Sequence, residues 1–416
     1  MNKAFSPACA LAAAGAAMIP LAAFAPKAMA PLFAAAALLA FFAHLVQART
    51  LPPVPVRLAL ALLAFAALAA LSAAWSVAPE QSLKATAPVA AMLFGGVVLF
   101  GLAAHLADQG RAAVRAAVIG GGALGGALVF GEWMFDRPIL LAYHVALGNP
   151  AHVSHLIVLF KPTSSVLALF AWPLLLAARH RYSRVAALAA GGVLLALFVA
   201  LEATTPLIAF AIGGVVFFFA RRFGRFVAPL LAAMLAIGVL AAPWIPAWLP
   251  NPEWESRKLG FLSNSAIHRI QIWQTTADHI HEKIWRGHGF DTARQLYPPD
   301  TRVTKILRRD DPAKTYDNPY EPIPLHPHNM ILQIWLELGL AGAALVLAAL
   351  GTVLAVLARA ALDKTEKAAG YAFFVTALAI GCISFGAWQA WWLSTILLNA
   401  ALMIAVFSRA PISPRA

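Results

Sequence analysis

The chain has 416 residues, of which 61% are hydrophobic and only 12% are charged. These values exclude an ordinary water-soluble domain and favour a protein with many spans of about 20 apolar residues each. The net charge of +13 does not indicate nucleic-acid binding, because the positions of the basic residues follow a membrane pattern. Cys9 and Cys382 lie far apart in apolar runs, so neither a disulfide framework nor a thiolate metal site is predicted.

The apolar runs are rich in Ala and Leu and do not alternate with polar residues, which favours helices over a β-barrel. We therefore predict an all-α polytopic integral membrane protein with about 12 transmembrane helices. The first run follows Lys3 and is also compatible with a cleaved signal peptide. The predicted spans are 6–24, 29–46, 57–76, 84–105, 111–131, 160–178, 184–201, 204–220, 225–245, 329–358, 367–388 and 391–408.

Basic residues in the short loops predict the orientation of these spans. With the N-terminus inside, sixteen Lys and Arg residues lie on the inner side and four in the short outer loops, as the positive-inside rule requires. The chain then divides into nine helices over 1–245, a large outer loop over 246–328 and three helices over 329–416. In a Gram-negative cell this topology predicts an inner-membrane protein with a periplasmic loop.

The large outer loop contains a pattern typical of an amphipathic helix that lies on the membrane face. Ser263 or Asn264 is a suitable N-cap for it. His268 and Arg269 fall beside the apolar stripe, at its polar boundary. Apolar residues recur at helical spacing at Ile267, Ile270, Trp273, Ala277, Ile280 and Ile284.

The loop ends in Pro322-Ile-Pro-Leu-His326-Pro-His328-Asn329, directly before a long apolar run. Ionisable groups at a membrane edge are costly to place and are therefore functional candidates. The helix N-terminus that follows would favour an anionic ligand. The alternative interpretation is that these polar side chains only anchor the helix at the interface.

Four cations on the predicted outer face are candidates for binding a phosphate or diphosphate, namely Arg269, Arg286, Lys161 and Lys84. A histidine beside them has the right pKa range for a general base. Together these residues predict group transfer from a phosphate-linked lipid. The alternative is that the loop cations pair with loop carboxylates as a solvated surface.

Three histidine pairs are candidate metal ligands: His279-x-His281, His326-x-His328 and His152-x-x-His155. None lies in an HExxH pattern, and no cysteine or carboxylate is spaced to complete a ligand set. We therefore predict no metal site and no cofactor. A transporter is the alternative from another class, but it would have charged residues in the middle of its spans, and these are nearly absent here.

Two stretches together resemble a known family. One is His326-Pro-His328-Asn329-x-x-Leu332-Gln333-x-x-x-Glu337-x-Gly339-Leu340-x-Gly342, and the other combines Ser265-x-x-x-Arg269-x-x-x-Trp273 with Gly287-His-Gly289. Their order and spacing over about 265–342 resemble the large periplasmic loop of the O-antigen ligase and O-antigen polymerase superfamily.

The resemblance implies a GT-C-like, metal-independent, inverting glycosyltransferase. Its donor would be a glycan on undecaprenyl pyrophosphate, and an O-antigen ligase would transfer that glycan to the lipid A–core of lipopolysaccharide. By the same resemblance His328 would be the base and Arg269 would engage the diphosphate. His326 and Asn329, at flanking motif positions, would bind the substrate through its diphosphate or sugar. An O-antigen polymerase or a protein O-oligosaccharyltransferase of this superfamily is the alternative.

The chain departs from that family at one turn. The family often has a Ser-Arg pair there, whereas this chain reads Glu202-Ala-Thr204-Thr205-Pro206. Another cation would then complete the diphosphate pocket, and Lys161, Lys84 and Arg286 are the candidates. The sequence identifies neither the glycan nor the acceptor sugar.

Overall fold

The computed structural model describes residues 5–146, 148, 160–252, 261–298, 301, 306–307, 315–316 and 321–408. Most of the described chain is helical, and two short strands, β1 (Ile306–Leu307) and β2 (Thr315–Tyr316), pair antiparallel. The helices are α1 (Pro7–Phe24), α2 (Met29–Ala48), α3 (Val56–Leu71), α4 (Pro79–Ala104), α5 (Asp108–Met134), α6 (Pro138–Ala146), α8 (Phe160–Arg181), α9 (Arg184–Ala200), α10 (Thr204–Phe223), α11 (Val227–Ala241), α12 (Asn264–Glu282), α13 (Met330–Arg359), α14 (Lys364–Gly381) and α15 (Ala390–Val406).

Each of the twelve predicted spans overlaps one of these helices, which confirms the predicted all-helical polytopic class, although the span 367–388 runs past the end of α14 at Gly381. Within the described residues, eight helical segments are long and apolar enough to cross a membrane. One of them, Thr204–Ala241, combines α10 and α11, while α9 and α15 are shorter apolar helices. The membrane-crossing count of twelve and the GT-C-like fold therefore stay predictions.

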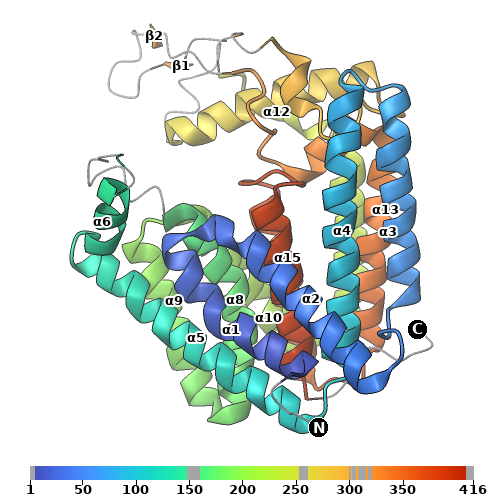
Figure 1. Cartoon of the computed structure of the whole chain (residues 1–416). Coiled ribbons are helices and arrows are strands. Elements are labelled where there is room, and N and C mark those ends of the chain that lie inside the picture. The colour runs from blue at the N-terminus through green and yellow to red at the C-terminus, as the bar shows by residue number, and fades with distance from the viewer. Residues whose placement is uncertain are drawn as a thin grey trace.

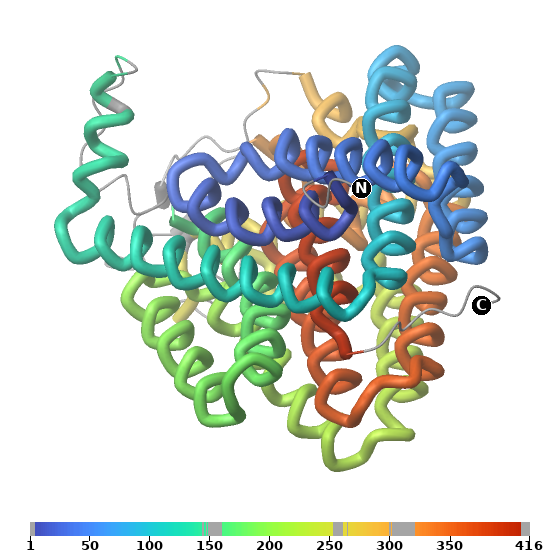
Figure 2. The backbone as a smooth tube through the Cα atoms, turned by 60° about the horizontal axis from the view of Figure 1, so that its bottom comes forward, coloured from blue at the N-terminus to red at the C-terminus, as the bar shows by residue number. Residues whose placement is uncertain are grey.

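Helix α15 lies in the middle of the bundle, where it packs against α2, α4, α5 and α8. Figures 1 and 2 both show it, in red, between the N-terminal helices and the green helices of the middle of the chain. Its side chains Trp392, Leu398 and Leu402 are completely buried. Apolar burial of this kind positions the residues at both ends of α15 against the neighbouring helices.

Helix α12 crosses one end of the bundle, and the N-terminus lies at the opposite end (Figure 1). We call these the α12 end and the Arg111 end, after Arg111 in the first turn of α5. The predicted helix is present as α12. Ser263 is its N-cap, because the Ser263 hydroxyl accepts a hydrogen bond from the Ala266 N–H at 3.3 Å. Ile267, with Ile270 and Ile280, is buried as the pattern predicts. Contact of α12 with a membrane face stays a prediction.

Helix α13 breaks at Gly339, which has φ +59° and ψ −155°. The break lets the segment 284–289 hydrogen-bond to α13, for example from the Gly289 N–H to the Glu337 carbonyl at 2.9 Å. A Cβ atom at Gly339 would lie 2.5 Å from the Trp285 carbonyl carbon, so both the conformation and the close approach require glycine. The glycines of the two motifs thus fix the end of the large loop against α13.

Candidate active site

The two motif histidines lie in the turn that leads into α13. The His328 N–H donates a hydrogen bond to His326 Nδ1 at 3.1 Å, and the ring centroids are 4.4 Å apart. His328 has φ +56°, a conformation that is uncommon for a residue with a side chain. Strained backbone of this kind is concentrated at functional sites.

The hydrogen bond of the His328 ring determines which nitrogen is available for chemistry. His328 Nδ1 lies 2.7 Å from the Ser384 carbonyl oxygen, and a carbonyl oxygen only accepts. Nδ1 therefore holds the proton in the neutral ring, and Nε2 has the free lone pair. This is the arrangement of a base whose ring is held in place by a third group.

Burial keeps the histidines of this turn neutral. It lowers the pKa of His328, and the nearby Arg269 lowers it further, while the hydrogen bond to Ser384 acts in the opposite direction. Burial, together with His328 and Arg269, lowers the pKa of His326 to about 3. A third histidine, His268 on α12, has its pKa lowered to about 4, mainly by burial and then by His328. Near pH 7 these rings are therefore neutral and hold one unprotonated nitrogen each.

Arg269 on α12 is a partly buried cation close to these histidines. Its Nη1 donates to the Ser265 carbonyl at 3.1 Å and to the Ser265 hydroxyl at 2.7 Å. Within the described residues its buried Nε–H has no hydrogen-bond partner, and no acidic residue of that part of the chain forms an ion pair with it. A guanidinium held in this way is well suited to an anionic ligand.

Trp273, one helical turn after Arg269, connects α12 to the histidine turn. Its indole Nε1 donates to the Pro327 carbonyl at 3.0 Å. Residues four apart lie on the same face of a helix. Ser265, which orients Arg269, Arg269 itself and Trp273, which binds Pro327, therefore lie in one row. The spacing noted in the sequence therefore has a direct structural purpose.

Asn329 is the N-cap of α13. Its Oδ1 accepts hydrogen bonds from the Ile331 N–H at 3.0 Å and the Leu332 N–H at 3.1 Å, which satisfies backbone donors that a helix start leaves unpaired. It thereby fixes the entry of the histidine turn into the helix. Contact of Asn329 with a substrate stays a prediction.

The other three predicted cations are all exposed. Lys84 on α4 forms an exposed ion pair with Glu80 at 2.7 Å, and Lys161 is exposed in the first turn of α8. Arg286 is exposed, and its carbonyl accepts from the Trp75 indole at 3.0 Å. Across the described ranges no hydrogen bond or ion pair joins any of the three to Arg269 or His328, so their role in binding a diphosphate stays a prediction.

Glu337 is the functional candidate that the sequence did not single out. It is completely buried, and its carboxylate accepts from the Gln333 amide at 2.9 Å, the Asp291 N–H at 2.6 Å and the Trp388 indole at 2.6 Å. Gln333 Oε1 in turn accepts from the Ala387 N–H at 2.8 Å. Both residues were part of the quoted motif, but their partners are 46 to 54 positions away and no local pattern indicates them.

The expectation that no carboxylate accompanies the histidine pairs is wrong for His279. Glu282 lies beside His279, with Oε2 3.1 Å from Nδ1, and 3.9 Å from Nε2 of His288, so a carboxylate does accompany two histidines. The expected pair partner His281 is not part of this group. The rings already have hydrogen-bond partners, since His279 Nε2 lies 2.8 Å from the Tyr297 hydroxyl and His288 Nε2 donates to the His279 carbonyl at 2.8 Å. The pair His152 and His155 lies outside the described residues.

Residues 169–347 match a family model described as O-antigen ligase. The matched region runs from α8 into α13 and contains Arg269, His326, His328 and Glu337. The predicted resemblance to the O-antigen ligase family is confirmed. Helices α1 to α6, α14 and α15 lie outside the matched region.

Bacterial relatives agree with this match. A protein of Rickettsia bellii (strain RML369-C) named "Putative polysaccharide ligase" is 33% identical over 202 residues, which are 49% of this chain and 47% of the relative. A protein of the same name from Rickettsia felis (strain ATCC VR-1525 / URRWXCal2) is 32% identical over 202 residues, again 49% and 47% of the two chains. The chain thus spans about half the length of the curated relatives it matches.

Proposed function

We propose that this protein is an O-antigen ligase of the bacterial inner membrane. It transfers a glycan from undecaprenyl pyrophosphate to a sugar hydroxyl of the lipid A–core at the periplasmic face. The observation that supports this most strongly is a cation, Arg269, whose Nε–H has no partner among the described residues. It lies beside the neutral ring of His328, whose Nδ1 is bound by Ser384 so that Nε2 has the lone pair. The charge asymmetry of the short loops supports a periplasmic location for both.

In the proposed reaction His328 is the general base. Its Nε2 takes the proton from the acceptor hydroxyl as the hydroxyl oxygen attacks the anomeric carbon of the donor sugar. The new C–O bond forms on the face opposite the bond to the diphosphate, so the anomeric configuration inverts. The proton ends on His328, and the electron pair of the broken bond ends on the diphosphate.

Arg269 stabilises the leaving diphosphate in this proposal. Negative charge grows on the leaving oxygen as the sugar–oxygen bond breaks, and a preoriented guanidinium stabilises it most in that state. A cation supplied by the protein makes a divalent metal unnecessary for this task. We therefore propose a metal-independent reaction in which Ser265 and Trp273 hold Arg269 and the histidine turn in register.

The test is transfer by the purified protein. Glycan on undecaprenyl pyrophosphate would be incubated with lipopolysaccharide that lacks the polymer, with and without EDTA. We expect polymer on the lipid A–core and unchanged turnover in EDTA. Transfer to the growing lipid-linked glycan itself would identify a polymerase, and transfer to protein an oligosaccharyltransferase. Loss of turnover in EDTA that Mg²⁺ restores would contradict the metal-independent mechanism.

A further inference from the structure

A second polar feature lies near the candidate active site. A cavity of about 230 Å³ lies beside the first turns of α4 and α15, and Gln81, Asp291 and Trp388 are among its lining residues. This volume is below the range of about 300–1,000 Å³ that drug-sized ligands occupy. The cavity is therefore suited to a small ligand unit such as one sugar ring.

Asp291 is held in this cavity by two hydrogen bonds. Its N–H donates to the Glu337 carboxylate at 2.6 Å, and its Oδ2 accepts from the Gln81 amide at 2.6 Å. It adopts φ +55°, a conformation that Asp and Asn adopt more readily than most residues with a side chain. A carboxylate accepts about four hydrogen bonds, and Asp291 therefore has acceptor capacity left for hydroxyl donors.

Trp388 is fixed by the same buried carboxylate. Its indole N–H donates to Glu337 at 2.6 Å, and its ring packs against Phe65 and Phe290 with centroid distances of 5.3 and 4.8 Å. The cavity thus combines a rigid aromatic ring with a carboxylate and an amide. Apolar surface with a few well-placed polar groups is the general composition of a small-ligand site, and a sugar presents both C–H faces and hydroxyls.

The charge of the cavity indicates which part of the substrates it would hold. Asp291 would repel a diphosphate, and Lys84, which also lines the cavity, is already paired with Glu80. A neutral saccharide is therefore favoured over an anionic group. The segment between α14 and α15 connects the cavity to the histidine turn. The Ser384 carbonyl accepts from the His328 ring, and Trp388, which lines the cavity, follows four residues later.

We infer that this cavity binds one neutral sugar residue of the glycan acceptor and positions its hydroxyl for His328. The inference rests on the proposed function. In this arrangement the acceptor sugar contacts Gln81, Asp291 and Trp388, while the donor diphosphate contacts Arg269. Glu337 is a positioning residue, because it holds the Asp291 backbone and the Trp388 indole.

The experiment compares steady-state kinetics of purified variants, with polymer-free lipopolysaccharide as acceptor and glycan on undecaprenyl pyrophosphate as donor. Asp291→Asn removes the charge but keeps a residue that tolerates positive φ. Gln81→Leu removes the amide at similar size, which provides a second variant if the first misfolds. Asp278→Asn is the matched control, because Asp278 is exposed on α12 and does not line the cavity.

For both cavity variants we expect the KM for acceptor to rise about 10-fold, as for the loss of a hydrogen bond to a charged or buried group. The KM for donor should stay within about twofold, and the control should change neither value. A rise in the KM for donor alone, or no change in either KM, would overturn the inference and leave the proposed function intact. Wild-type protein that transfers no glycan would overturn both.

Discussion

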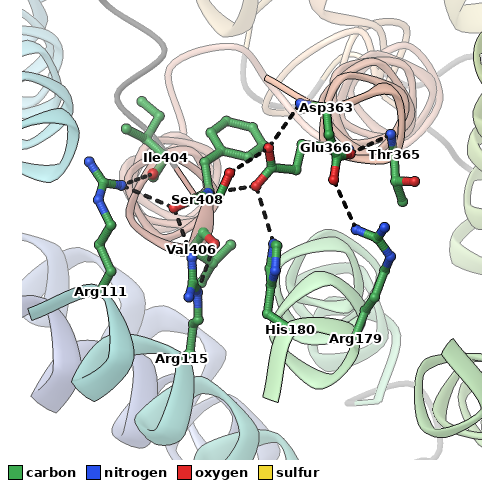
Figure 3. A network of polar contacts seen from close by, with 11 residues as sticks. Arg111, Arg115, Arg179, His180, Asp363, Thr365, Glu366, Ile404, Val406 and Ser408 are labelled. Carbon is green, nitrogen blue, oxygen red and sulfur yellow. Dashed lines mark hydrogen bonds and ion pairs between the residues drawn. The ribbon is translucent and has the colours of Figure 1, made fainter. Parts of the chain in front are cut away.

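Two clusters of basic residues lie at opposite ends of the bundle and differ in their partners. At the Arg111 end, Arg111 is only 3% exposed and donates to the Ala104 carbonyl at 2.6 Å. It also donates to the Ile404 carbonyl at 3.2 Å (Figure 3). Arg115 donates to the Val406 carbonyl at 3.0 Å. These bonds satisfy carbonyls that the C-terminal turns of α4 and α15 leave unpaired.

The carboxylate of this cluster is equally well satisfied. Glu366 accepts from the Asp363 N–H at 3.1 Å and the Ser408 hydroxyl at 2.9 Å, and it lies 3.2 Å from the His180 ring (Figure 3). Arg269 at the α12 end has the opposite character, because its Nε–H has no partner among the described residues. Buried cations with complete partner sets stabilise helix packing, whereas a cation with a free donor is available to a ligand.

The largest effect should come from the base at the α12 end. We expect His328→Ala to reduce transfer at least about 100-fold, since positioned proton transfer contributes about 10²–10⁴-fold. Turnover by purified protein and the melting temperature would be measured together, and the melting temperature should change little. His281→Ala is the control, because His281 is an exposed histidine of the same loop. Near-normal turnover in His328→Ala would remove its assignment as base.

A smaller effect is expected from the cation. Arg269→Ala should lower kcat/KM for donor about 10- to 100-fold, corresponding to one charge-assisted contact to the diphosphate. The KM for acceptor should change far less. Arg294→Ala serves as the control, because Arg294 is exposed in the same loop. An equal loss for donor and acceptor would instead indicate collapse of the loop.

Glu366 at the Arg111 end should affect stability rather than chemistry. Glu366→Gln replaces an acceptor oxygen with a donor, which leaves a buried N–H or hydroxyl without its partner and costs about 1–3 kcal/mol of unfolding free energy. We expect a lower melting temperature, while turnover per folded molecule stays within about twofold. A specific loss of turnover at unchanged stability would show that the two ends do not differ as described.

The pH profile provides the most sensitive comparison. His328 must be neutral to act as base, and its pKa is lowered from 6.5, so kcat/KM should stay constant on acidification through pH 6.5 and fall only below it. Arg269→Gln removes a nearby positive charge, which raises the pKa of His328. The acidic limb of that variant should therefore move to higher pH. An unmoved limb would contradict the proximity of the two groups as the cause of the shift.

The sequence was sufficient for the features that local patterns encode. The twelve apolar runs correspond to helices, and Ser263 caps α12 as expected. The apolar spacing predicted the helix that carries Arg269 and Trp273, and in the structure Trp273 joins this helix to Pro327. Local periodicity determines such features because each depends on residues within a few turns.

The sequence alone did not predict the hydrogen-bond partners of individual polar residues. Arg111 and Arg269 are both arginines near helix starts, and only the fold reveals that Arg111 binds carbonyls 293 and 296 positions away. Glu337 is similar, because its contacts with Asp291 and Trp388 join residues 46 and 51 positions away. Whether a cation is structural or available to a ligand therefore depends on long-range packing, which charge and spacing do not determine.

The central claim is tested most directly by the lipopolysaccharide profile of a cell that lacks its own ligase. Such a cell would be complemented with this gene and, in parallel, with the His328→Ala variant expressed at the same level. We predict that the wild-type gene restores a polymer ladder on the lipid A–core and that the variant does not. Absence of polymer on the core with the wild-type gene, or an equal ladder with both, would contradict the account.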